Sequence, residues 1–171
     1  VEAIKIGDPK AADTKVGTLI SQGEAIRVEA AIKQAVKDGA TLLTGGARDK
    51  TLITPAIVCG VDPKSAFAQD ELFGPAIAVS SADGIKEAIG LANSTVYGLG
   101  AGVFTKNVDV AIQSAREIDA GIIHINWTPL WRADLMPYGG LKSSGVGKEG
   151  VRSTVTEMTE EKTIILHGRS W

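Results

Sequence analysis

Apolar residues in the first third of the chain recur at the spacing of an α-helix. They stand three or four positions apart, at Ala25, Val28, Ile32, Ala35 and Val36. The preceding Ser21-Gln22-Gly23-Glu24 has the pattern of a capping box, in which the hydroxyl and the carboxylate each bind a free amide. Gly39 supplies the left-handed residue that ends many helices. The pattern therefore predicts a helix over residues 21–38.

Two short β-prone runs follow this helix, on either side of a Gly45-Gly46 break. They cover Ala40–Thr44 and Ile53–Cys59. Runs of this kind separated by glycines predict two strands, which can form a hairpin.

From residue 76 onward, apolar runs alternate with helical stripes. The runs are Ala76–Val79, Gly100–Phe104 and Gly121–Ile125. The apolar stripes of the helices expected from Asp83 and Asn107 are Ile85, Ala88, Ile89 and Ala92, and Val108, Ala111, Ile112 and Ala115. Each stripe has the spacing with which a helix covers a sheet. The alternation predicts an α/β domain with a parallel sheet, and the nearly continuous apolar runs predict strands buried on both faces.

The end of the chain contains a glycine-rich loop and an isolated β-prone run. The loop, Gly139–Gly150, must make tight turns in which backbone approaches backbone. A helix is expected next, with an apolar side formed by Val151, Val155 and Met158. Thr163–Leu166 then predicts a strand, separated from the rest by four polar residues. A lone strand needs a partner to bind its amides.

Composition narrows the range of partners. The chain has 171 residues, 44% of them hydrophobic, and a net charge of −2 without a dense Lys/Arg block, which argues against nucleic acid as a partner. No run of about 18 apolar residues predicts a membrane span, and the amino terminus lacks the layout of a secretory signal. A cytoplasmic location is therefore the default expectation. Because residue 1 is Val and not Met, we expect a processed chain or a piece of a longer one.

One segment carries more chemical information than the rest. Gln69-Asp70-Glu71-Leu72-Phe73-Gly74-Pro75, followed by an apolar strand, resembles the cofactor-contact motif of the NAD(P)-dependent aldehyde dehydrogenases. Other segments resemble that family in the same order along the chain: Ile6–Pro9, Val16–Ile20, Gly39–Gly46, Ala92–Leu99 and Met136–Gly145. Thr18 departs from the pattern, since the family usually has proline there.

The resemblance implies a fold and a division of the chain. Residues 1–158 would be the C-terminal portion of the family's parallel-sheet, three-layer catalytic domain, which is incomplete here. Residues 159–171 would form the oligomerisation strand and tail, with Thr163–Leu166 pairing with another subunit of a homo-oligomer.

The resemblance also assigns cofactor contacts to two residues. It implies that Glu71 binds the nicotinamide ribose of NAD or NADP and that Phe73 packs on the ribose and nicotinamide. A carboxylate suits the first role, because it only accepts hydrogen bonds and has room for two hydroxyl donors. The alternatives are a solvated glutamate at the start of a strand and an aromatic residue of the core.

The loop Asn126–Tyr138 is the second candidate site. It leaves the end of a predicted parallel strand, where ligands usually bind. The family uses this loop to line its aldehyde tunnel, so the resemblance makes four residues substrate-side candidates: Trp127, Trp131, Arg132 and Tyr138. Both tryptophans could equally be packing residues. An arginine here favours acidic or hydroxylated aldehydes, unless Asp134 holds it in an ion pair.

No residue of this chain is predicted to be catalytic. The single cysteine, Cys59, excludes an internal disulfide and a multi-cysteine zinc site, and no metal site is predicted. Cys59 ends an apolar strand and its neighbours differ from the family's cysteine motif, so it reads as a buried small hydrophobe. His124 and His167 have no Cys or Ser at a spacing that would indicate a catalytic pair. The family's nucleophilic cysteine and general base lie upstream of the motif at a greater distance than this chain extends.

These observations predict part of an oxidoreductase that oxidises an aldehyde to a carboxylic acid with NAD(P). By resemblance, the whole enzyme forms a thiohemiacetal on its cysteine, passes hydride to the nicotinamide and hydrolyses the thioester. The chain alone is expected to be inactive, because it has neither this cysteine nor a dinucleotide-binding motif. A non-catalytic assembly module and part of a CoA-acylating relative are the alternatives.

Overall fold

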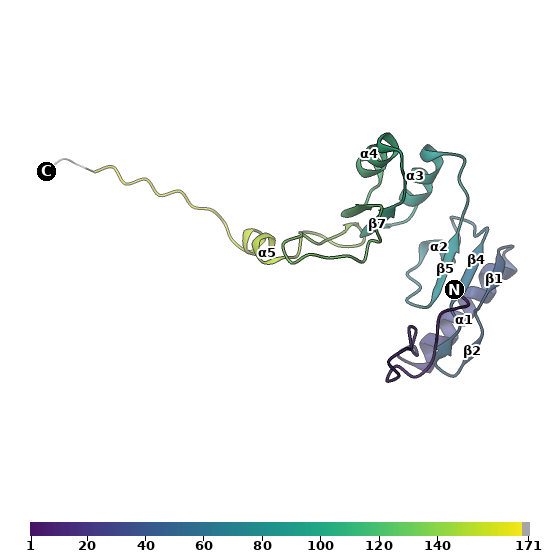
Figure 1. Ribbon diagram of the computed structural model, residues 1–171. Coiled ribbons are helices and arrows are strands. Elements are labelled where there is room, and N and C mark those ends of the chain that lie inside the picture. Colours follow the sequence, from purple (N-terminus) through teal and green to yellow (C-terminus); the bar gives the residue numbers. More distant parts are fainter. Residues whose placement is uncertain (169–171) are drawn as a thin grey trace. The chain divides into compact units, whose positions relative to one another are not determined.

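The computed structural model describes residues 1–168 and divides the chain into two compact units. The first unit is Val1–Thr95 and the second is Val96–Trp171. Figure 1 shows the helices and strands of both units. None of the helices described there is long and apolar enough to cross a membrane.

The predicted first helix is present as α1, Gln22–Lys37. The Ser21 hydroxyl accepts a hydrogen bond from the Glu24 amide at 3.2 Å, as in a capping box, but the Glu24 carboxylate binds Arg27. At the other end, Gly39 has φ +106°, and the amides of Gly39 and Ala40 donate to the carbonyls of Val36 and Ala35. These two bonds form a Schellman motif. Both boundaries are therefore those that the sequence predicts.

A three-stranded sheet lies beside α1 in the first unit (Figure 1). Strand β1 (Thr41–Thr44) pairs antiparallel with β4 (Ala56–Cys59), which pairs in parallel with β5 (Ala76–Val79). The predicted pairing of the two β-prone runs is confirmed. The second run is broken, however, because Pro55 has no amide to donate to a ladder. Residues before it form a small hairpin of β2 (Arg48–Asp49) and β3 (Leu52–Ile53).

The core of the first unit lies between α1 and this sheet. Its fully or nearly fully buried residues are Ala25, Val28, Ile32, Ala35, Ala40, Ile53, Ala56, Val58 and Val61. Strand β5 contributes little to this core: Ile77 is 54% exposed and Val79 is 44% exposed. The prediction that the apolar strands are buried on both faces is wrong for β5, because no described element covers its outer face.

Two further helices complete the first unit, α2 (Ala66–Gln69) and α3 (Ile85–Asn93). Helix α3 begins two residues later than predicted, because Gly84 and not Asp83 is its N-cap. The Asp83 amide binds the Glu87 carboxylate. Of the predicted apolar stripe, Ile89 is buried and the alanines are exposed.

The second unit contains a strand, helix, strand segment with parallel pairing. Strand β7 (Gly100–Val103) pairs in parallel with β8 (Ile122–Ile125), and α4 (Val108–Glu117) connects them. The Asn107 side chain caps α4 by accepting the amides of Asp109 and Val110. A short antiparallel pair, β6 (Tyr97–Gly98) and β9 (Leu141–Lys142), joins the glycine-rich loop to the start of the unit. The parallel pairing predicted from the alternation is thus confirmed.

Within the first unit β5 pairs with β4, and within the second unit β7 pairs with β8. One detail of the helix prediction is wrong. Helix α4 buries Ala111 and Ser114, whereas Val108 is 72% exposed and Ile112 is 50% exposed. Small residues allow a helix to approach its sheet closely, and they, not the bulkier apolar residues, face inward here.

The chain ends in a short helix and an extended segment. Helix α5 is Val151–Glu157, and its predicted apolar side is exposed, with Val151 at 86% and Met158 at 79%. Residues 159–168 form no strand in the single chain, and Ile164, Ile165 and Leu166 are all more than 70% exposed. Pairing of Thr163–Leu166 with another subunit therefore stays a prediction. The last three residues of the predicted tail, 169–171, lie outside the described part.

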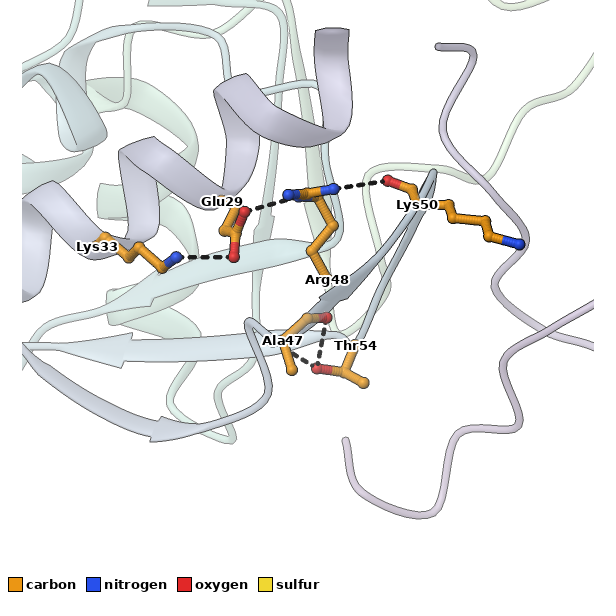
Figure 2. Close-up of polar contacts among 6 residues, drawn as sticks. All are labelled: Glu29, Lys33, Ala47, Arg48, Lys50 and Thr54. Carbon is orange, nitrogen blue, oxygen red and sulfur yellow. Dashed lines mark hydrogen bonds and ion pairs between the residues drawn. The ribbon is translucent and has the colours of Figure 1, made fainter. Parts of the chain in front are cut away.

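An ion-pair network ties α1 to the β2–β3 hairpin (Figure 2). The Glu29 carboxylate accepts from Lys33 one helical turn away, at 2.8 Å, and from Arg48 of β2, at 2.7 Å. Arg48 also donates to the Lys50 carbonyl in the turn of the hairpin. The two cations lower the pKa of Glu29 below its ordinary value of 4.5, because their hydrogen bonds favour the carboxylate.

This shift predicts a contribution of Glu29 to stability that is lost in acid. A carboxylate with a lowered pKa in the folded state stabilises the fold above its ordinary pKa, and this contribution disappears as the pH falls below 4.5 toward the folded-state value. We expect the urea midpoint to fall less between about pH 6 and about pH 3 in Glu29→Gln than in the unmodified chain. Equal acid sensitivity of the two proteins would contradict a stabilising role of the ionised carboxylate.

Candidate functional site

The motif Gln69–Pro75 forms the connection between α2 and β5. Its beginning is held in place by the Gln69 side chain, which donates to the carbonyl of Pro63 at 2.6 Å and to that of Ser94 at 3.1 Å. The Asp70 amide closes α2 by donating to the Ala66 carbonyl. Beyond Asp70 the chain passes over Val28 of α1 at Gly74 and then enters the parallel strand β5. The motif is thus a loop anchored at its start, at the amino end of a strand.

Glu71 lies on the surface of this loop. Its side chain is exposed, and within residues 1–168 it makes no hydrogen bond or ion pair. The carboxylate can therefore accept hydrogen bonds from a ligand without first giving up a protein partner. A free surface carboxylate is also common in proteins, so exposure alone does not assign it a ligand.

Phe73 is the more unusual residue of the loop. Its φ of +47° places a bulky aromatic residue in the left-handed region, which costs about 1–3 kcal/mol. Its side chain is 78% exposed, so the alternative of a core aromatic is wrong. Strain of this kind persists only where the surroundings impose it, and it concentrates at functional sites. An exposed aromatic ring is thus held in a strained conformation two residues after Glu71.

Helix α1 contacts the backbone of this loop at two points. The Arg27 guanidinium donates to the Leu72 carbonyl at 2.6 Å. A Cβ at Gly74 would lie 2.7 Å from both γ-carbons of Val28, so the backbone of the turn sits directly on the helix. The sequence pattern does not reveal Arg27 as part of the site. It stands 45 residues before Leu72, on a helix that also exposes two other cations, Lys33 and Lys37.

The loop Asn126–Tyr138 of the second unit begins where the sequence predicts, at the carboxyl ends of two parallel strands. Asn126 adopts φ +57°, its amide donates to the Val103 carbonyl at 2.7 Å, and its side-chain oxygen accepts the Thr105 amide at 2.8 Å. One residue therefore links the ends of β7 and β8 at the point where the loop begins.

The structure places the four substrate-side candidates in three different contacts. Arg132 lies over the Tyr138 ring, with its guanidinium carbon 3.8 Å from the ring centre. Trp131 contacts the His124 ring edge to face, with ring centres 6.2 Å apart. Trp127 is 57% exposed, and its carbonyl lies against Gly102 of β7.

These contacts decide some of the open alternatives. Arg132 forms no ion pair with Asp134 in the described part of the chain; a cation–π contact holds it instead. Trp131 packs through one edge and remains 50% exposed, so it is partly a packing residue. His124 is half-buried, and its Nε2 is enclosed without a hydrogen-bond partner. The sequence gives no signal for the His124–Trp131 contact.

Cys59 ends β4, as predicted, but it is half-buried rather than fully buried. It borders a cavity of about 510 Å³ together with Pro63, Val79, Ser80 and Glu87. None of the described residues that line this cavity is a histidine that could act as a base for the thiol. Among the described residues, no group of three or more histidine, cysteine or acidic side chains is placed to hold a metal ion.

Comparison with known proteins places these observations in a family. The sequence model that describes the aldehyde dehydrogenase family matches residues 1–164 of this chain. The lactaldehyde dehydrogenase of Methanococcus maripaludis (strain S2) is 43% identical over 162 residues, which are 95% of this chain and 35% of the relative. The chain therefore spans about a third of the length of this curated relative.

Two solved structures are similar in fold. Glyceraldehyde-3-phosphate dehydrogenase GapN from Methanocaldococcus jannaschii, complexed with NADP, aligns with TM-score 0.90 at 38% identity, over 96% of this chain and 36% of that one. Aldehyde dehydrogenase of Mycobacterium tuberculosis, complexed with NAD+, aligns with TM-score 0.90 at 34% identity, over 100% and 36%. The α/β fold, the motif in its loop and the family match agree, and the chain belongs to the aldehyde dehydrogenase family.

Proposed function

We propose that this chain supplies a cofactor ribose contact, part of the aldehyde tunnel and the subunit contact of an enzyme that oxidises an aldehyde to a carboxylic acid with NAD or NADP. The observation that carries the proposal is the loop at Glu71 and Phe73. It places a free carboxylate and a strained, exposed aromatic ring two residues apart in one loop. Two structural relatives that hold NADP and NAD+ support the choice of cofactor.

The chemistry of the two side chains fits this ligand. The Glu71 carboxylate has room for two donors, which matches the neighbouring 2′ and 3′ hydroxyls of a ribose. The exposed face of Phe73 offers an apolar surface for the sugar and the nicotinamide ring. When bound, NAD(P)+ supplies the hydride acceptor. The part of Glu71 and Phe73 is to orient the nicotinamide end of the cofactor, since neither side chain forms or breaks a bond.

Arg132 suggests the class of aldehyde. Its guanidinium lies on Tyr138 and has no carboxylate partner within the described residues, so its donors remain available to a substrate. We propose an aldehyde that carries a hydroxyl or acidic group, which a guanidinium can bind through charge-assisted hydrogen bonds. The relative from Methanococcus maripaludis is named for lactaldehyde, a hydroxylated aldehyde.

The role of Glu71 is testable in a chimeric enzyme. In the chimera, residues 1–164 of this chain replace the matching segment of the Methanococcus maripaludis lactaldehyde dehydrogenase. We expect Glu71→Gln to raise the KM for the nicotinamide cofactor about tenfold, the effect of losing about 1.4 kcal/mol of charge-assisted hydrogen bonding. The measurement is steady-state NAD(P)H formation at varied cofactor and saturating lactaldehyde.

Two controls complete this experiment. Asp70→Asn removes a neighbouring carboxylate from the same loop, and we expect it to leave the cofactor KM within about twofold. The isolated 171-residue chain should form no NAD(P)H with any aldehyde, because it lacks the family's cysteine motif. If Glu71→Gln and Asp70→Asn behave alike in the chimera, the ribose role of Glu71 is wrong. NAD(P)H formation by the isolated chain would contradict its assignment as a supporting part.

The exposed segment after α5 supports a subunit contact. Ile164, Ile165 and Leu166 are consecutive and exposed, and within residues 1–168 the segment pairs with no strand. We propose that Thr163–Leu166 adds as a strand to another subunit, which would bind its amides and cover its apolar side chains. Ile165→Lys should shift the chain to a monomer in light scattering, whereas His167→Lys, outside the segment, should not. If the unmodified chain is already monomeric at high concentration, both this subunit contact and the alternative of a non-catalytic assembly module are wrong.

A further inference from the structure

Arg27 reaches from α1 to the backbone of the loop that carries Glu71 and Phe73. Its Nη2 donates to the Leu72 carbonyl at 2.6 Å, a short distance for a charge-assisted bond. The accepting carbonyl belongs to the peptide group between Leu72 and Phe73. The bond therefore acts on the link that joins the two proposed cofactor contacts.

A second residue of α1 orients the guanidinium. The Glu24 carboxylate accepts from the Arg27 Nε at 2.9 Å and lies 2.8 Å from its Nη2. Glu24 is itself placed by the first turn of the helix, where its amide is bound by the Ser21 cap. As a simple ion pair on an exposed helix surface, Arg27 and Glu24 would contribute little to stability. Because Arg27 also donates to the Leu72 carbonyl, the pair connects α1 to the backbone of the loop.

The loop needs to be held, because its conformation is strained. Phe73 is at φ +47°, and such a residue relaxes to ordinary backbone angles unless its neighbours prevent it. The chain supplies restraints on both sides of Phe73. Arg27 binds the carbonyl before it, and Gly74 after it rests on Val28, which is fully buried. Leu72, half-buried against the core, adds a third restraint.

We propose that Arg27 is a positioning residue of the cofactor site, which keeps the Leu72–Phe73 peptide in the orientation that presents Glu71 and Phe73 to the cofactor. Arg27 touches neither cofactor nor substrate in this proposal, and it acts through the backbone alone. The inference rests on the proposed cofactor role of Glu71 and Phe73 and adds the residue that maintains their conformation.

The first test uses the complete 171-residue chain and does not require activity. The chain has three phenylalanines. Labelling with fluorinated phenylalanine should give each of them its own 19F signal. We expect Arg27→Ala to move the Phe73 signal toward its position in the urea-unfolded chain while the Phe104 signal stays unchanged. Lys33→Ala is the matched control, since it removes a cation from the same helix that pairs with Glu29 and not with the loop. It should move neither signal.

The second test uses the chimera with lactaldehyde. Arg27→Ala should raise the cofactor KM about tenfold and leave the lactaldehyde KM unchanged, and Lys33→Ala should change neither. In a Glu71→Gln, Phe73→Ala background, Arg27→Ala should have no further effect on the cofactor KM, because the groups that it positions are gone. A purely structural role of Arg27 would lower the midpoint of urea unfolding without this dependence on background.

The outcomes separate the inference from the function on which it rests. If Glu71→Gln raises the cofactor KM and Arg27→Ala does not, the positioning role is wrong and the proposed function stands. If neither variant changes the cofactor KM, the proposed function fails. A Phe73 signal that behaves alike in Arg27→Ala and Lys33→Ala overturns the positioning role whatever the kinetics.

Discussion

Gly45→Ala should destabilise the first unit by roughly 4 kcal/mol or more, an unusually large effect for one methyl group. Gly45 has φ +75°, which L-residues with a side chain rarely adopt. A Cβ there would also lie 1.8 Å from the Pro55 carbonyl oxygen and 2.9 Å from the Ala56 Cα. These are backbone atoms at the start of β4, so β1 and β4 would have to separate. Urea unfolding followed by circular dichroism measures the loss.

Gly39→Ala is the matched control for this variant. Gly39 also has a positive φ, +106°, but no atom lies within 4 Å of the position that a Cβ would occupy. The substitution adds backbone strain without a collision, and we expect a loss of about 1–2 kcal/mol. If the two variants lose equal stability, strain alone explains both, and the close approach of Gly45 to Pro55 has no energetic importance.

Ile53→Ala should cost about 2–5 kcal/mol, because it leaves a cavity in the core of the first unit. Ile53 is 0% exposed and belongs to the cluster that includes Val28, Ile32 and Val58. The same substitution at Ile20, whose side chain is 94% exposed, should change the unfolding free energy by less than about 0.5 kcal/mol. Comparable losses for Ile53→Ala and Ile20→Ala in urea unfolding would mean that the core lies elsewhere.

The elements that the sequence predicts well depend on interactions between neighbours in the chain. Helix α1 has its boundaries at a serine cap and a glycine stop, both of which act within one helical turn. The strands β5, β7 and β8 coincide with their apolar runs to within a residue at either end. The family assignment likewise rests on short motifs in order, and the family match confirms it.

Predictions that required knowledge of distant neighbours were less successful. The apolar stripe of α4 predicts burial of Val108 and Ile112, yet Ala111 and Ser114 face the sheet. The alternation of elements predicts parallel strands, but it does not say which of them share a sheet. Burial depends on what covers a face, and the chain spans about a third of a relative such as the lactaldehyde dehydrogenase. Apolar pattern by itself cannot show whether the cover is present.

The proposed cofactor site likewise combines features encoded by neighbouring residues in the chain with features that depend on distant contacts. The sequence by itself determined the family, the motif with Glu71 and Phe73, and the loop that carries Arg132, because short-range order in the chain encodes all three. Only the tertiary structure decided that Phe73 is strained and exposed, that Arg132 lies on Tyr138, and that Arg27 binds the Leu72 carbonyl. Arg27 and Leu72 are 45 residues apart, and their contact exists only because the packing of α1 on its sheet brings the helix beneath the loop.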